Sequence, residues 1–245
     1  MSLDVASLAH SMRDRLPPKH DAGWTLGISR PEAMAEPAEK AARHLDLPAR
    51  QTILDEGDEA RSLHVILEGS VMLSKLLPDG RRQIIELLGP GDVFGLCINR
   101  LSDVTAETVL PSRIVVYDRA VAESSPSLQR LVADRMKAQI CALHDHAMLL
   151  GRKNAVERVA TFLMRLVPNR GGQGCAGPLA AGKADQAQVH VTLTRQEIAD
   201  YLGLTLETVS RAFSLLKRQG VLAYGRHDDV TIGNVCRLCQ CTGSH

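Results

Sequence analysis

Three polar residues close together near the C-terminus have side chains that could read the edges of DNA bases. Glu207, Ser210 and Arg211 are spaced so that they share one face of a helix. Arginine can donate two hydrogen bonds to guanine, glutamate can accept one from cytosine, and serine can contact thymine or a phosphate. Nearby polar and basic residues could contact the DNA backbone, which adds affinity without reading sequence. These backbone candidates are Thr194, Thr205, Lys217, Arg218 and Arg226.

The surrounding residues predict a helix-turn-helix that would hold these side chains. Thr194 and Glu197 have the spacing of a capping box at a helix start. Gly203 can adopt the left-handed conformation of a tight turn, and Thr205 can cap a second helix. Residues 221–232 then read as a hairpin wing. One alternative is a pair of packed helices that binds no ligand. Another is a pure protein-interaction module, which would leave Glu207, Ser210 and Arg211 without a role.

A β-rich segment lies upstream, over residues 51–118. Short apolar runs alternate there with turn signals, about every 8–12 residues, which is typical of a small antiparallel sandwich or barrel. Pro78-Asp79-Gly80 is a strong hairpin signal, because proline presets φ and glycine accepts a positive φ. The runs predict separate strands at Leu63–Leu67, Ser70–Leu77, Ile84–Leu88, Val104–Val109 and Ile114–Asp118.

A long helix is predicted to begin at Ser125-Pro126 and to join the two regions. Apolar residues recur along it at steps of 3 and 4, which is the heptad pattern of a coiled-coil seam. The seam residues are Met136, Ile140, Leu143, Ala147 and Leu150. The pattern favours a parallel homodimer with two recognition helices one DNA turn apart, about 34 Å. The alternative is a stripe that packs on its own β domain.

Composition excludes several classes of protein. The chain has 245 residues, 44% of them hydrophobic and 3% aromatic, so a globular fold is expected and base-stacking RNA readers are disfavoured. No long apolar run or secretory signal is present, so no membrane partner and a cytoplasmic location are expected. Residues 1–150 hold 17 basic and 21 acidic residues, whereas residues 151–245 hold 12 and 7, so the C-terminal part suits phosphate contact. No credible nucleophile–base pair or phosphate loop is present, so an enzyme is not expected.

The predicted organisation is an α+β chain of four parts. They are an N-terminal arm at 1–44, a β-roll at 45–124, a dimerisation helix at 125–151, and a winged helix-turn-helix with a C-terminal tail at 152–245. Within the arm, a short helix is expected near Pro37–His44. Residues 168–188 are rich in glycine and are expected to form a surface loop.

Taken together, these motifs resemble the CRP/FNR superfamily of bacterial transcription regulators. The resemblance covers roughly residues 45–235, and the sequence from Glu207 to Arg211 matches the E-x-x-S-R pattern of the FNR-type branch. The sequence Gly91-Asp92-Val93-Phe94-Gly95-Leu96 is similar to FixK-type regulators of microaerobic and nitrogen-fixation genes. The resemblance implies a cyclic-nucleotide-binding-like β-roll and a homodimeric activator at TTGAT-N4-ATCAA-like sites. It also implies contact of RNA polymerase with a hairpin carrying Asp79, Arg81 and Arg82, and with the loop at 168–188.

The same resemblance implies that no cyclic nucleotide binds. Members that bind one carry Gly-Glu-Leu and Arg-Ser in the phosphate cassette. Here Gly95-Leu96-Cys97 and Val104-Thr105 stand in those positions, and apolar Leu and Val cannot make charge-assisted bonds to ribose or phosphate. We therefore expect no cofactor.

Other cysteines and histidines leave alternatives open. The FNR iron–sulfur cluster is not expected, because no cysteine precedes Cys97. Cys236, Cys239 and Cys241 could be inert tail thiols, redox-active, or metal ligands. Haem sensing through His64, His144 or His146 is also open, although His144 and His146 read as solvated positions beside the seam. The alternative function is thus a sensor of the same superfamily, gated by haem, a metal or a small molecule. The target genes, the activating signal and the choice between activation and repression do not follow from the sequence.

Overall fold

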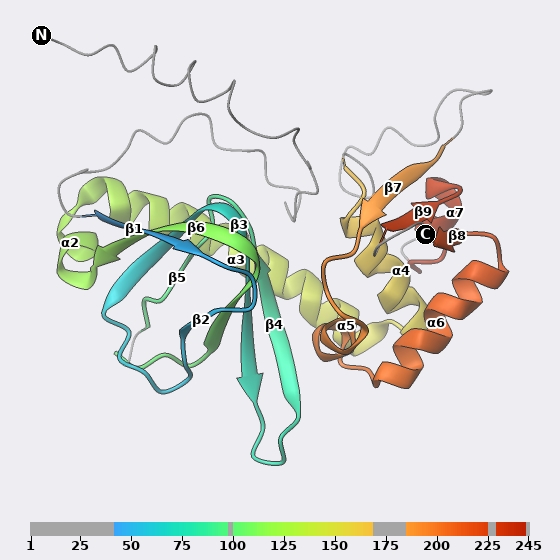
Figure 1. Ribbon diagram of the computed structural model, residues 1–245, viewed down its shortest axis with the longest axis horizontal. Coiled ribbons are helices and arrows are strands. Elements are labelled where there is room, and N and C mark those ends of the chain that lie inside the picture. The colour runs from blue at the N-terminus through green and yellow to red at the C-terminus, as the bar shows by residue number, and fades with distance from the viewer. Residues whose placement is uncertain (1–41, 98–99, 169–184, 225–228, 244–245) are drawn as a thin grey trace, which may run out of the picture.

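One long helix connects an antiparallel β unit to a mainly helical C-terminal unit (Figure 1). The structure is a computed structural model that describes residues 42–97, 100–168, 185–224 and 229–243. None of the helices in these ranges combines the length and apolar character needed to cross a membrane.

The β unit is a single antiparallel sheet. Its main strands follow the order β1-β6-β3-β4, while β2 pairs with β6 and β5 with β3. The strands are β1 (Ala42–Leu47), β2 (Thr52–Leu54), β3 (Ser62–Leu76), β4 (Arg82–Leu88), β5 (Val93–Phe94) and β6 (Thr105–Asp118). The expected β-roll is therefore confirmed. The helix expected near Pro37–His44 is wrong over residues 42–44, because β1 pairs there with the edge of β6.

Strands β3 and β6 each run through a point where the sequence predicts a break. Each of them continues as one long, irregular strand, with shifts of register between Ile66 and Val71. Gly69 explains how this is possible. Its φ is +90°, and a Cβ at this position would collide with atoms of Pro111 and Ser112 on β6. A glycine therefore allows the two backbones to approach where the pairing shifts.

The predicted hairpin joins β3 to β4. The amide of Leu77 donates to the carbonyl of Arg81 at 2.8 Å, and Gly80 has the expected positive φ of +86°. In Figure 1 this hairpin extends far beyond the rest of the sheet.

Two helices follow the sheet, α2 (Arg119–Ser124) and α3 (Pro126–Arg152). Ser125 caps α3 as its sequence predicts, because its hydroxyl accepts from the amide of Leu128 and proline occupies the first turn. Leu128 is fully buried among side chains of the sheet, so the start of α3 is anchored to the β unit.

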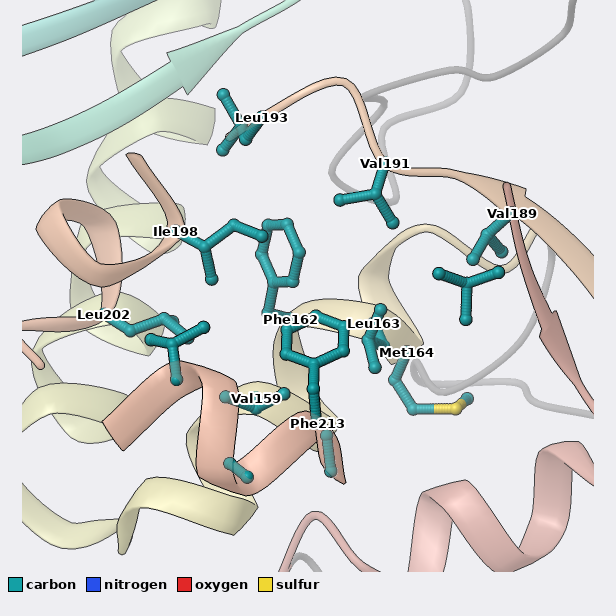
Figure 2. Close-up of a cluster of buried hydrophobic side chains, with 14 of the residues drawn as sticks. Val159, Phe162, Leu163, Met164, Val189, Val191, Leu193, Ile198, Leu202 and Phe213 are labelled. Atoms are coloured by element: carbon teal, nitrogen blue, oxygen red, sulfur yellow. The ribbon is translucent and has the colours of Figure 1, made fainter. Parts of the chain in front are cut away.

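The C-terminal unit holds the predicted winged helix-turn-helix. Its elements are α4 (Ala155–Arg165), β7 (Ala187–His190), α5 (Arg195–Leu202), α6 (Leu206–Arg218), β8 (Leu222–Tyr224), β9 (Asp229–Ile232) and α7 (Val235–Gln240). The strands form an antiparallel sheet in the order β7-β9-β8. Side chains of α4, β7, α5 and α6 meet in one apolar core around Phe162 and Phe213 (Figure 2).

The residues predicted as a C-terminal tail are folded. Asn234 caps α7 by accepting from the amide of Arg237 at 2.8 Å. Leu238 is fully buried, and Cys239 and Cys241 pack against the core of the unit. Residues 235–243 are therefore part of the folded C-terminal unit. A six-residue helix has too short an apolar pattern to stand out in the sequence.

Candidate nucleic-acid interface

Helix α6 buries one face and exposes the other. Thr205 caps it by accepting from the amide of Thr208 at 3.2 Å. Buried apolar residues at helical spacing hold it against α4 and α5; they are Val209, Ala212, Phe213 and Leu216. The opposite face is open to solvent over the whole helix.

The three predicted base-reading residues share this open face. Glu207, Ser210 and Arg211 are all exposed, and with Ser214 and Arg218 they line a shallow hollow on the surface. Arg211 donates to the carboxylate of Glu207 at 2.5 Å, one helical turn earlier. This pair lies on the exposed face, where a guanine edge for Arg211 and a cytosine edge for Glu207 could replace the contact.

Helix α5 and the turn set the position of α6. The capping box is present, with Thr194 accepting from the amide of Glu197 at 3.2 Å and Glu197 accepting from the amide of Thr194 at 2.7 Å. Gly203 ends α5 with φ +60°, and the amide of Leu204 donates to the carbonyl of Ala199. A Cβ at Gly203 would lie 3.3 Å from the side chain of Leu150, so the turn also fits closely against the end of α3.

The candidates for backbone contact have different surroundings. Lys217 and Arg218 are exposed in the last turn of α6. Thr194 and Thr205 are exposed at the helix starts, although their hydroxyls already serve as caps. Arg226 lies outside the described residues. The wing strands β8 and β9 pair as predicted.

The predicted seam is a stripe of exposed apolar residues on α3. Met136, Ile140 and Leu143 have exposed fractions of 52%, 48% and 40%, and Ala147 is also exposed. Leu150 is half-buried, because it turns toward the core of the C-terminal unit. The stripe does not pack on its own β unit as the alternative interpretation requires.

The hairpin residues proposed to contact RNA polymerase are not equivalent. Arg81 is exposed and pairs with Asp79 in the same turn, at 2.8 Å. Arg82 instead donates through Nε to the carboxylate of Asp200 on α5, at 2.8 Å. The two arginines are neighbours in the sequence, but only Arg82 has a contact with another unit of the molecule.

Two of the three candidate haem histidines are buried. His146 is only 6% exposed and stacks on Tyr201 of α5 with ring centroids 4.4 Å apart, so its predicted solvated position is wrong. Burial, together with the positive charges of Arg165 and Arg158, lowers the pKa of His146 to about 4. His64 stacks on Phe94, and burial lowers its pKa to about 4 as well.

His144 is exposed, as predicted. Within the described ranges, no cluster of three or more cysteine, histidine or acidic side chains could hold a metal ion.

Two contacts made by arginine side chains were not predicted from the sequence. Arg50 forms an ion pair with Glu197, and Arg237 donates to the carbonyl of Gln219 at the end of α6, at 3.1 Å. Arg50 and Glu197 are 147 positions apart, so no spacing rule could have paired them. The burial of Glu197 could not be predicted either, because its place in the capping box already accounts for a glutamate at this position.

Comparisons with known proteins agree with this arrangement of units. Residues 157–241 match the Crp-like helix-turn-helix domain, and residues 44–124 match the cyclic nucleotide-binding domain. The chain is 35% identical over 189 residues to the nitrogen fixation regulation protein FixK of Bradyrhizobium diazoefficiens, which covers 76% of both chains. It is 32% identical over 191 residues to the transcriptional activatory protein AadR of Rhodopseudomonas palustris, again covering 76% of both.

Among solved structures, FixK2 from Bradyrhizobium japonicum is similar in both sequence and fold. Its TM-score is 0.69 at 33% identity, covering 83% of this chain and 98% of that one. A CRP-family regulator from Thermus thermophilus has a TM-score of 0.67 at 24% identity, with 82% of this chain and 97% of that one covered. This second likeness concerns the fold alone.

Proposed function

Because the chain belongs to the CRP/FNR family, and is a DNA-binding transcription regulator related to FixK, we propose that it acts as a homodimeric activator at TTGAT-N4-ATCAA-like sites. The observation that carries the proposal is the exposed face of α6, with Glu207, Ser210 and Arg211 side by side. A helix entering the major groove by its N-terminal part would bring these residues to the base edges.

A dimer provides the two-fold symmetry that such a site requires. The stripe of Met136, Ile140, Leu143 and Ala147 is apolar, exposed and continuous along α3. A second copy of the same helix would cover it in a parallel pair. Two copies of α6 would then face successive major grooves, about 34 Å apart.

The β unit does not fit a cyclic nucleotide, although its fold is that of cyclic nucleotide-binding domains. Leu96 and Val104, which stand where a ribose-binding glutamate and a phosphate-binding arginine would be, pack against apolar clusters of the sheet. Neither can neutralise a phosphate. We therefore propose DNA binding without a cyclic nucleotide, with the β unit as a docking and activation surface.

Footprinting of the purified full-length protein, with no added ligand, on a TTGAT-N4-ATCAA duplex tests the proposal. We expect protection of both half-sites and none on a duplex with scrambled half-sites. An absorption spectrum and metal analysis of the same preparation test the alternative of a ligand-gated sensor. A stoichiometric chromophore or metal, together with a footprint that requires it, would overturn ligand-independent binding.

A further inference from the structure

The β unit holds helix α5 of the helix-turn-helix directly. Arg82 on β4 donates to Asp200, and Gln83 beside it donates through Nε2 to the carbonyl of Tyr201 at 3.2 Å. From the turn between β1 and β2, the guanidinium of Arg50 forms an ion pair with Glu197. The three contacts bind α5 at Glu197, Asp200 and Tyr201. They are called the α5 clamp below.

Each acidic side chain of α5 in the clamp is paired with an arginine of the β unit. The side chains of Glu197 and Asp200 are 8% and 10% exposed, and those of Arg50 and Arg82 are 37% and 31% exposed. Two carboxylates on a short helix are thus nearly removed from water, and each faces an arginine of the other unit. Removing the arginine of such a pair leaves a buried carboxylate with no counter-charge, which is unfavourable, and only the hydrogen bonds from Thr194 to Glu197 and from Gln196 to Asp200 remain.

The backbone of Arg50 adds an independent observation. Its φ is +63°, a left-handed conformation that glycine or asparagine adopts more easily than arginine. The hydrogen bond of its amide to the carbonyl of Thr108, at 2.8 Å, fixes the turn in this conformation. The side chain contact to Glu197 gives a reason for an arginine at a position where its backbone is strained.

Apolar packing continues across the same boundary. Met72, Ile84 and Leu87 of the sheet are buried in the cluster that also contains Ile198 and Leu202 of α5. The clamp therefore adds directional contacts to an apolar one, because ion pairs and hydrogen bonds require a defined geometry whereas apolar contacts do not.

We propose that the α5 clamp, formed by Arg50, Arg82 and Gln83, positions the helix-turn-helix on the β unit of the same chain and thereby selects the spacing between half-sites. The inference rests on the proposed function as a dimer at a two-fold site. One added base pair moves a half-site by about 3.4 Å and rotates it by about 35° around the DNA axis. A helix-turn-helix free to turn on its linker could follow that change, and a clamped one cannot.

Charge reversal provides the test. Arg82→Asp and Asp200→Arg each place like charges together, and the double variant Arg82→Asp/Asp200→Arg restores an opposite pair in reversed order. Arg82→Gln and Asp200→Asn serve if a reversal does not fold. Arg61→Asp is the matched control, because Arg61 is an 80% exposed arginine of the same unit that pairs with Glu59, also in the β unit. Affinity is measured on duplexes with spacers of three, four, five and six base pairs.

For the wild type and Arg61→Asp, we expect one spacer to be preferred over its neighbours by roughly tenfold or more. Each single reversal should reduce that preference to about threefold or less, and the double variant should restore it. A merely structural role would lower affinity at every spacer equally. An unchanged preference in the single variants, or no rescue in the double variant, would overturn the proposal.

A failure of the proposed function can be distinguished from a failure of the α5 clamp. If the wild type does not distinguish any TTGAT duplex from a scrambled one, the target site is wrong, and calorimetry of the same variants decides whether the clamp exists. The clamp predicts that each single reversal separates the unfolding of the two units into two transitions and that the double variant reunites them. Identical unfolding curves for all variants would refute it.

Discussion

Arg211 is the residue on which we expect the reading of the DNA sequence to depend most. Its side chain is 77% exposed and pairs with Glu207 on the same helix face, from which it could reach a guanine in the major groove. Arg211→Ala should weaken binding to the intact site by about 1–3 kcal/mol per half-site and abolish the discrimination against a guanine substitution. Fluorescence anisotropy with the two duplexes measures both effects.

Lys217→Ala provides the comparison for Arg211. An exposed lysine in the last turn of α6 is suited to contact a phosphate, so its loss should weaken binding to all duplexes alike. The slope of the logarithm of the binding constant against the logarithm of the salt concentration should also become smaller by about one. If Arg211→Ala kept the discrimination of the wild type, Arg211 would not read a base.

His146 predicts a pH dependence of stability. Its folded pKa of about 4 lies below the ordinary value of 6.5, so the unfolded chain takes up the proton first as the pH falls. The contribution of His146 is complete above pH 6.5 and is lost between pH 6.5 and about 4, by roughly 3 kcal/mol. His146→Phe keeps an aromatic ring against Tyr201 and should remove this part of the acid destabilisation. Urea unfolding at about pH 4.5 and about pH 7.5 measures it, and equal losses in both proteins would contradict the assignment.

At the scale of elements, residues with local effects were predictable. Ser125, Thr194 and Thr205 cap the helices that their positions indicate, because a cap depends on neighbouring amides alone. Gly203 forms the predicted left-handed turn for the same reason. The sequence therefore predicted the exposed face of α6 and the three candidate base-reading residues on it.

Features that depend on distant partners were not predictable. The continuation of β3 through Gly69 depends on how closely β6 approaches, and the burial of His146 depends on Tyr201, which lies on another helix. Arg81 and Arg82 look alike in the sequence, yet only Arg82 meets α5. In each case the deciding neighbour is far away along the chain, and local propensity contains no information about it.

The stripe on α3 predicts what a charge in its centre will do. Ile140→Asp would bury two carboxylates without partners in the proposed dimer, at a cost of roughly 3 kcal/mol or more, or about a hundredfold in the dimer dissociation constant. Asp145→Lys is the control, because Asp145 is an exposed residue of the same helix on the face away from the stripe. Sedimentation equilibrium should find a monomer only for Ile140→Asp. An undisturbed dimer would show that α3 is not the interface.

At the scale of the whole molecule, DNA binding and activation should separate. Arg81 is exposed in the turn of the hairpin and pairs there with Asp79, so Arg81→Ser should leave DNA affinity unchanged and alter stability by about 0.5 kcal/mol or less. If the tip contacts RNA polymerase, transcription in vitro should fall at equal promoter occupancy. Full transcription would exclude Arg81 from activation. Arg82 is left unchanged in this experiment, because its loss would disturb the α5 clamp and could alter DNA binding as well as transcription.

The most direct measurement of dimeric, sequence-specific binding is a titration of two fluorescent duplexes with the ligand-free protein, followed by sedimentation of the complexes. One duplex carries both half-sites, and the other carries one half-site with its partner scrambled. Two chains should bind the first duplex, at least about a hundredfold more tightly than the second, because a scrambled half-site loses several base contacts of about 1–3 kcal/mol each. Equal affinity for the two duplexes, or a single chain on the intact site, would contradict the proposed function.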